Sequence, residues 1–284
     1  MSAALPEGAW LNPRAAAGGF RLDTVVLDVD GVLIDVRESF REAVRETVVT
    51  LQRSLGVAAP WKPSHEDILV FKRGGGFNDD IDLSIALTAI GAAGRGEDAA
   101  TIARDTERAG GGLPALRAAA PELPRIAGRE VLRIFDDLYW GGLVDRERAL
   151  VPPDFPQRLR DAGARHVALV TGRTPRELDA ALQRLGWDRL ALCHAVTGDV
   201  VRKPDPACLD EVAQRCNPLS MVYVGDVRDD WELVRRWREE RAGGVPVRGI
   251  LVGEDAEMEG YRPLGVDATV RESGDVLAVL PRWR

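Results

Sequence analysis

Residues 24–35 read Thr-Val-Val-Leu-Asp-Val-Asp-Gly-Val-Leu-Ile-Asp. The apolar run, rich in β-branched residues, is typical of a buried strand, and it ends in two aspartates, Asp28 and Asp30, followed by Gly31. Open α/β sheets place their chemistry at the carboxyl ends of such strands. Because unpaired carboxylates are costly to bury, the stretch predicts a catalytic strand end, the simpler alternative being an Asp-x-Asp-Gly turn.

A divalent cation would explain why two carboxylates follow one buried strand. Carboxylate oxygens are hard ligands of the kind that Mg²⁺ prefers, and the cation partly neutralises them. A carboxylate at such a site is also able to attack an electrophile. The stretch therefore predicts a metal-assisted nucleophile.

Three further segments end apolar runs with polar groups that such a site needs. One predicted strand stops at the hydroxyl of Thr171, and Lys203 precedes a proline that keeps the chain extended. Another predicted strand ends in Gly-Asp226, with further acids at Asp229 and Asp230. Only three lysines occur in the chain, and a lysine kept at 203 among so many arginines favours a site that needs a compact charge, the simpler alternative being a surface lysine in a proline-flanked loop.

In this order the four segments resemble the motifs of the haloacid dehalogenase superfamily, and in particular a subfamily IA-like phosphatase with a helical C1 cap. The specific motifs cover residues 24–36 and about 150–280. Between them the resemblance rests only on position and helical character. It implies an α/β fold, with a Rossmann-like parallel sheet as the core and an inserted helical cap.

The resemblance also assigns roles to the motif residues. Asp28 would attack phosphorus and form an aspartyl-phosphate, while Asp30 would protonate the departing oxygen and later accept a proton from water. Thr171 would donate a hydrogen bond to a phosphoryl oxygen, and Lys203 would neutralise charge on the nucleophile and the phosphoryl group. Apart from the resemblance, Arg173 directly follows Thr171-Gly172 and is a candidate for holding an anion, while helix capping or a salt bridge explains it equally well.

Magnesium is the cofactor that the resemblance implies. Its ligands would be Asp28, the backbone carbonyl of Asp30, and Asp226, with Asp230 reached through water. Val227 departs from the pattern, because many relatives carry Thr or Ser after Gly-Asp. We expect this change to affect outer hydrogen bonding rather than metal binding.

Hydrophobic periodicity and the glycine and proline positions predict the domain organisation. Residues 1–22 form an N-terminal arm, residues 23–36 and 151–284 form the core, and residues 37–150 form a helical cap. After residue 155 helices alternate with strands, which predicts a parallel sheet with crossover helices. The expected helices are 37–53, 80–91, 99–109, 129–138, 155–162, 175–185, 206–215 and 229–240, and the expected strands are 166–171, 191–196, 221–225, 248–252 and 267–270.

Residues 71–80, Phe-Lys-Arg-Gly-Gly-Gly-Phe-Asn-Asp-Asp, are the cap segment with the strongest case for substrate contact. Two cations before three glycines would present positive charge and backbone N–H groups to an anion. The simpler interpretation is that a helix ends, the glycines turn the chain, and Asn78 or Asp79 caps the next helix. The candidate substrate-binding residues are Lys72, Arg73, Asn78, Thr171, Gly172 and Arg173.

The composition, 45% hydrophobic and 29% charged, is that of an ordinary soluble globular protein. No apolar run approaches the ~20 residues that span a bilayer, so no membrane partner is expected. A net charge of −7 argues against a nucleic acid as the main partner, because its phosphate backbone is also negatively charged. Cys193, Cys208 and Cys216 are too few and too scattered for a disulfide framework or a zinc site, which favours a cytoplasmic location.

The sequence therefore predicts a Mg²⁺-dependent phosphatase that acts on a small phosphorylated metabolite. A phosphomutase of the same fold and a non-catalytic binding protein are the alternatives. A dehalogenase is disfavoured, because that branch does not use an acid/base aspartate at position 30. The substrate stays open between histidinol phosphate, to which the resemblance points weakly, and phosphoglycolate or a sugar phosphate, and the sequence predicts no oligomeric state.

Overall fold

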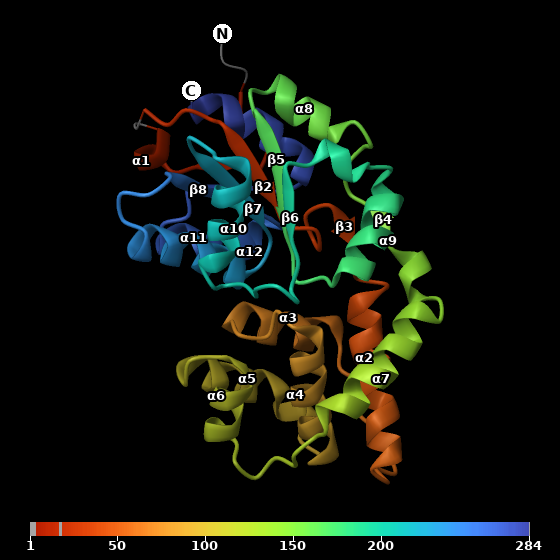
Figure 1. Ribbon diagram of the computed structural model, residues 1–284. Coiled ribbons are helices and arrows are strands. Elements are labelled where there is room, and N and C mark those ends of the chain that lie inside the picture. The colour runs from red at the N-terminus through yellow and green to blue at the C-terminus, as the bar shows by residue number, and fades with distance from the viewer. Residues whose placement is uncertain (1–3, 17–18, 284) are drawn as a thin grey trace. The chain divides into compact units, whose positions relative to one another are not determined.

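A computed structural model describes residues 4–16 and 19–283 of the chain. The chain divides into two compact units, of which one comprises residues 1–35 and 148–284 and the other residues 36–147. The first unit is built on a sheet and the second is helical (Figure 1). The helical unit is therefore inserted into the chain of the sheet unit shortly after the stretch that carries Asp28 and Asp30.

The main sheet has seven strands within the described residues, in the order β1-β9-β8-β7-β2-β5-β6. All neighbours are parallel except β1, which pairs antiparallel with β9 at one edge. This mostly parallel sheet with crossover helices confirms the predicted α/β class. The strands are β1 (Trp10–Leu11), β2 (Thr24–Leu27), β5 (His166–Val170), β6 (His194–Val196), β7 (Met221–Gly225), β8 (Val247–Val252) and β9 (Ala268–Val270).

Strand β2 lies in the interior of the sheet between β5 and β7. All its residues are buried, as its uninterrupted apolar run predicts. Its Val25 is in register with Val167 of β5 and Val222 of β7. The carboxyl ends of the three strands therefore lie side by side, and the polar residues that follow each of them meet at one edge of the sheet.

Most helices that connect the parallel strands lie where the sequence predicts them, but α12, between β8 and β9, was not predicted, because its acidic residues were interpreted as a solvated loop. Helix α9 begins with a capping box, in which Thr174 and Glu177 satisfy each other's backbone N–H groups, and it ends at Gly186 in the left-handed conformation. Trp231 and Trp237 of α11 are buried. The helices of this unit are α1 (Pro13–Ala16), α8 (Phe155–Asp161), α9 (Pro175–Leu185), α10 (Ala207–Cys216), α11 (Arg228–Glu240), α12 (Asp255–Tyr261) and α13 (Val276–Val279).

The inserted unit is helical, and its helices agree closely with the predicted ones except in two places. Helix α6 was not predicted, because Gly110, Gly111 and Gly112 were interpreted as a break, yet the helix begins at Gly112 itself. For helix α3 the sequence predicted only that a helix ends near Gly74, and it gave no starting residue. The helices are α2 (Phe40–Ser54), α3 (His65–Gly74), α4 (Asp80–Ala92), α5 (Ala99–Arg108), α6 (Gly112–Ala119) and α7 (Gly128–Trp140).

Short elements complete the fold. Strands β3 (Ile34–Asp35) and β4 (Arg148–Ala149) pair antiparallel within the sheet unit, where the chain leaves for the helical insert and returns from it. Strand β6 is shorter than predicted, because a 3₁₀ turn takes the preceding residues. The 3₁₀ segments are Gly96–Asp98, Leu143–Arg146, Arg189–Ala191, Arg262–Leu264, Ser273–Asp275 and Leu280–Trp283.

The cysteines correct one expectation from the sequence. Cys193, just before β6, and Cys216, at the end of α10, form a disulfide with Cα atoms 5.8 Å apart. Their wide spacing gave no sign of this pairing, because only the packing of α10 beside β6 brings them together. Cys208 stays a buried free thiol. Among the described helices, none combines the length and apolarity that crossing a membrane requires.

Candidate active site

A chain of buried charges links three loops at the carboxyl edge of the sheet. The ammonium of Lys203 donates to Asp28 Oδ2 at 2.6 Å and to Asp230 Oδ1 at 2.7 Å. Asp28 is anchored because its backbone N–H donates to Val224 of β7, and its Oδ1 accepts the backbone N–H of Val29 at 2.7 Å. The structure therefore brings together the first, third and fourth predicted motifs.

Asp230 is completely buried and uses both carboxylate oxygens within the protein. Besides Lys203, its Oδ1 accepts the hydroxyl of Tyr223 at 2.8 Å. Its Oδ2 accepts the backbone N–H groups of Asp226 at 3.0 Å and Val227 at 3.1 Å. Asp230 thus fixes both the Lys203 ammonium and the loop that carries Asp226.

Three carboxylates lie close enough together to share a cation. One oxygen each of Asp28, Asp226 and Asp230 lies within 4.8 Å of the others. Gly31 makes room for this cluster, because a Cβ built on it would lie 1.9 Å from Asp226 Oδ2. Among the described residues, Asp230 accepts four hydrogen bonds within the protein and Asp28 accepts two, so Asp28 and the half-buried Asp226 are better suited to direct coordination than Asp230. A small set of hard oxygen donors of this kind fits Mg²⁺.

The pKa values of the central pair follow from burial and charge. Burial raises the pKa of Asp28 to about 7, since desolvation of the carboxylate outweighs the attraction of Lys203. Burial lowers the pKa of Lys203, but Asp230 and Asp28 together outweigh it and the net shift is upward. Lys203 therefore stays charged at neutral pH, whereas Asp28 without a cation lies near its midpoint.

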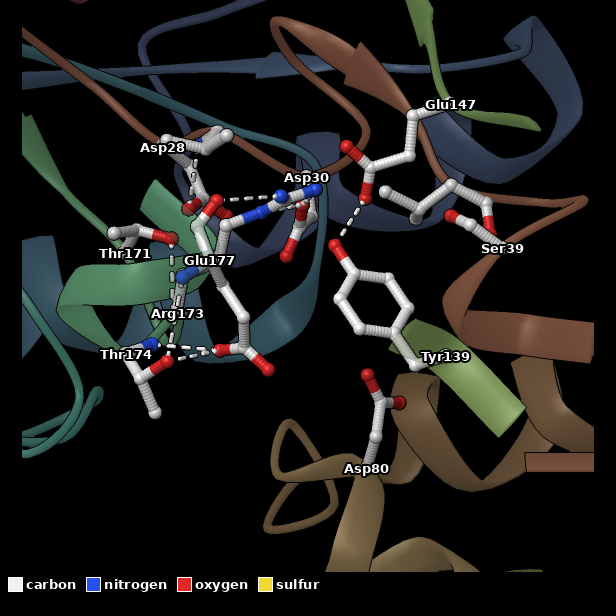
Figure 2. Close-up of polar contacts among 12 residues, drawn as sticks. Asp28, Asp30, Ser39, Asp80, Tyr139, Glu147, Thr171, Arg173, Thr174 and Glu177 are labelled. Carbon is white, nitrogen blue, oxygen red and sulfur yellow. Dashed lines mark hydrogen bonds and ion pairs between the residues drawn. The ribbon is translucent and has the colours of Figure 1, made fainter. Parts of the chain in front are cut away.

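The second aspartate of the first motif, Asp30, is paired with Arg173 rather than with a lysine. Arg173 Nη2 lies 2.7 Å and its Nε 2.8 Å from Asp30 Oδ1 (Figure 2). The backbone N–H of Arg173 donates to Thr171 Oγ1 at 3.2 Å. Thr171 in turn donates its backbone N–H to Val196 of β6. Arg173, a candidate for binding an anion, is thus placed in the salt bridge that was the alternative interpretation.

Residues 71–80, the segment of the helical unit that was predicted to contact substrate, have the local structure of the simpler interpretation: a helix ends, glycines turn the chain, and the next helix is capped. Lys72 lies 3.0 Å from Asp80 Oδ1, and Arg73 lies 2.9 Å from Glu66 Oε1. Asp79 is the N-cap of α4, where its carboxylate accepts the backbone N–H groups of the first turn. Both cations thus have partners within their own unit. Asn78 is half-buried in the turn before this cap.

Sequence reasoning missed two residues of the site. Tyr223 was interpreted only as part of a buried strand, although a hydroxyl in the middle of such a strand needs a partner and is a signal in itself. Glu177 was assigned no role, yet its backbone carbonyl accepts Arg173 Nη1 at 3.1 Å. Burial raises the pKa of the Glu177 carboxyl, whose Oε2 accepts the hydroxyl and the N–H of Thr174. No sequence signal pointed to this contact.

Comparison with known proteins now identifies the family. Residues 22–232 match the haloacid dehalogenase-like hydrolases, so the chain belongs to this family. The match covers all four predicted motifs and confirms the resemblance drawn from them. It agrees with the expected class of enzyme, a phosphoric monoester hydrolase.

Individual relatives are more distant. The chain is similar to a phosphatase, Tt82, from Thermococcus thioreducens, with 28% identity, 85% of this chain and 99% of that one covered, and a TM-score of 0.63. CbbY from Rhodobacter sphaeroides, solved with phosphate, is 17% identical over 90% of this chain and 96% of its own, with a TM-score of 0.56, and shows the fold alone. An imidazoleglycerol-phosphate dehydratase from Phytophthora nicotianae is 26% identical over 74% of this chain, which spans only 40% of that protein.

Proposed function

We propose that the protein is a Mg²⁺-dependent phosphatase that hydrolyses a small phosphorylated metabolite through an aspartyl-phosphate. The observation that supports this most is the Asp28–Lys203–Asp230 chain beside Asp226. It joins a nucleophile, a fixed positive charge and a second carboxylate at one sheet edge. A phosphate monoester is a dianion with a poor leaving group. A site of this composition supplies the group that attacks phosphorus and the positive charge that stabilises the phosphoryl oxygens.

In the first half of the reaction, a carboxylate oxygen of Asp28 attacks phosphorus. The bond between phosphorus and the ester oxygen breaks, and its electron pair stays on the departing oxygen. Asp30 donates a proton to that oxygen, so the product leaves as an alcohol. Lys203 and the hydroxyl of Thr171 stabilise the charge of the phosphoryl group during transfer.

In the second half, water attacks the phosphorus of the aspartyl-phosphate. Asp30, now ionised, accepts the proton of the attacking water, and the bond between phosphorus and Asp28 breaks. Inorganic phosphate leaves and both aspartates return to their starting states. The same residue therefore serves first as acid and then as base.

Magnesium would be held by Asp28, Asp226 and the backbone carbonyl of Asp30. Asp230 would hold the loop that carries Asp226 in place. Bound at this site, Mg²⁺ would neutralise charge on the phosphoryl oxygens and orient them for in-line attack. The half-exposed Asp226 and the three neighbouring carboxylate oxygens are the features of this chain that favour such a cation.

The helical unit, residues 36–147, is proposed as the cap that selects the substrate and excludes water. Lys72, Arg73 and Asn78 remain its candidate contacts. Histidinol phosphate and phosphoglycolate are the first substrates to try. The similarity to a protein named for an imidazole phosphate ester is a reason to include the former. A cytoplasmic location belongs to the same proposal, although the disulfide is unusual there.

The test is phosphate release from p-nitrophenyl phosphate and a panel of phosphorylated metabolites, with and without Mg²⁺. We expect Mg²⁺-dependent turnover that disappears in Asp28→Asn. Asp226→Asn should need far more Mg²⁺ for the same rate. Isomerisation of a sugar phosphate without phosphate release would indicate the mutase, and binding without turnover would indicate a non-catalytic protein. Either result would refute the proposal.

A further inference from the structure

The side chain of Arg173 is a charged group that the proposed reaction does not use. It lies on the loop between β5 and α9 and is only 1% exposed. A buried guanidinium is costly unless its N–H groups are paired. Its contacts should therefore reveal what it is for.

Arg173 is held by its own loop, by the first turn of α9 and by the loop after β6. Its Nη1 donates to the backbone carbonyl of Glu177 in the first turn of α9, at 3.1 Å. Its backbone N–H donates to Thr171, and its backbone carbonyl accepts the N–H of Gly198 at 3.0 Å. Gly198 approaches so closely that a Cβ there would lie 2.3 Å from the carbonyl oxygen of Gly172. The guanidinium is thus a rigid part of the sheet edge.

The contact of Arg173 with Asp30 uses only one of the two carboxylate oxygens. Both Nε and Nη2 reach the same oxygen, Oδ1, at 2.8 and 2.7 Å (Figure 2). In the part of the chain that the structure describes, no donor reaches Asp30 Oδ2. Arg173 therefore sets the direction of the carboxylate and leaves one defined oxygen for proton exchange.

We propose that Arg173 is a positioning residue that holds Asp30 so that Oδ2 exchanges the proton with the leaving group and with water. This inference rests on the proposed phosphatase function. A substrate-binding role for Arg173 is disfavoured, because its N–H groups already serve Asp30 and Glu177 and its side chain is buried. Substrate would have to break these bonds to reach it.

The role predicts a dependence on the leaving group. p-Nitrophenolate is a good leaving group that departs without a proton, whereas the phenolate of phenyl phosphate is poorer and gains from one. In first-turnover measurements, Arg173→Met should slow release from phenyl phosphate about 100-fold, and release from p-nitrophenyl phosphate less than about tenfold. Arg173→Lys, which keeps the charge without the fork, should recover part of the loss.

A double variant separates positioning from other effects. If Arg173 acts through Asp30, Arg173→Met should add little to the loss already caused by Asp30→Asn. The matched control is Arg189→Met, which removes an exposed pair with Asp179 in the same unit and should change neither rate. If Arg173→Met does not fold, Arg173→Lys is carried through the same cycle.

The outcomes distinguish this inference from the function on which it rests. Equal losses on both substrates, or additive losses in the double variant, would overturn the positioning role while an active wild type keeps the phosphatase. A wild type that releases no phosphate, or an Asp28→Asn variant that stays active, would instead refute the phosphatase itself.

Discussion

Lys203 and Asp28 are 175 residues apart in the sequence, and their charged atoms lie 2.6 Å apart. The contact joins the loop after β2 to the loop that precedes α10. Both side chains are almost fully buried, at 1% and 5% exposure. Because Lys203 also holds Asp230, it is the cation that keeps two buried acids side by side.

Removing this cation should destabilise the protein strongly in the absence of metal. In Lys203→Met, Asp28 and Asp230 face each other without a counter-charge, and a broken buried ion pair costs about 3–5 kcal/mol. Added Mg²⁺ should restore part of the free energy of unfolding, since it supplies the missing positive charge and binds only the folded state. Urea unfolding in EDTA and in Mg²⁺ measures both effects.

Lys62→Met is the matched control for this change. Lys62 pairs with Glu42 and Glu46 on the surface of the helical unit, where its side chain is 37% exposed. Its loss should cost less than about 1 kcal/mol and should not depend on Mg²⁺. A Lys203→Met variant as stable as this control would show that the buried carboxylates are protonated or hydrated instead.

The affinity for Mg²⁺ should rise with pH up to neutrality. Burial raises the pKa of Asp28 to about 7, so below that pH the metal-free carboxyl is mostly protonated and must lose its proton to bind. The affinity should increase about tenfold per pH unit below pH 7 and level off above it. Calorimetric titration at several pH values, in buffers of different ionisation enthalpy, measures the affinity and the proton released.

The same shift has a consequence for stability, with the opposite sign. Between the ordinary pKa of 3.8 and about 7, folded Asp28 binds a proton that the unfolded chain has lost. The metal-free protein should therefore lose this contribution to stability as pH rises through that window. Asp28→Asn should remove both pH dependences. A metal affinity that does not change between pH 6 and 8 would contradict the shift.

Gly31 is expected to tolerate no side chain. It has a φ of +74°, and an added Cβ would lie 1.9 Å from Asp226 Oδ2. Gly31→Ala should therefore push Asp226 away and weaken Mg²⁺ binding, in addition to the roughly 1–2 kcal/mol of left-handed strain. Calorimetry and thermal unfolding report the two effects.

Gly265→Ala is the control that introduces backbone strain without a steric clash. Gly265 has a φ of +88° and no atom within 4 Å of its Cβ position, so only the strain applies there. We expect a similar loss of stability and no change in metal binding. Equal metal affinities in the two variants would show that Asp226 is not confined by Gly31.

Much of this fold could be predicted because its signals are local. The run before Asp28 has to be a buried strand, and helix-period patterns punctuated by glycine give most helices of both units. The motif residues follow strand ends, so the parallel topology alone brings Asp28, Thr171 and Asp226 to one edge.

The remaining contacts could not be predicted, because they depend on tertiary packing. Nothing near Arg173 in the sequence selects Asp30 as its partner, and the pairing of Cys193 with Cys216 appears only once α10 lies beside β6. Helix α6 was missed for a different reason, since Gly112, interpreted as part of a break, is the first residue of the helix.

Tyr223→Phe should show whether the support behind Lys203 matters for catalysis. The hydroxyl of Tyr223 shares Asp230 Oδ1 with Lys203, and its removal leaves that oxygen with a single donor among the described residues. A lost buried hydrogen bond costs about 1 kcal/mol of stability. Because Lys203 would then be held less firmly, kcat should fall several-fold, whereas KM and Mg²⁺ affinity should change little, since neither depends on the hydroxyl. Steady-state kinetics beside urea unfolding separates these effects. A variant that loses stability but keeps its kcat would mean that Asp230 holds Lys203 without help from Tyr223.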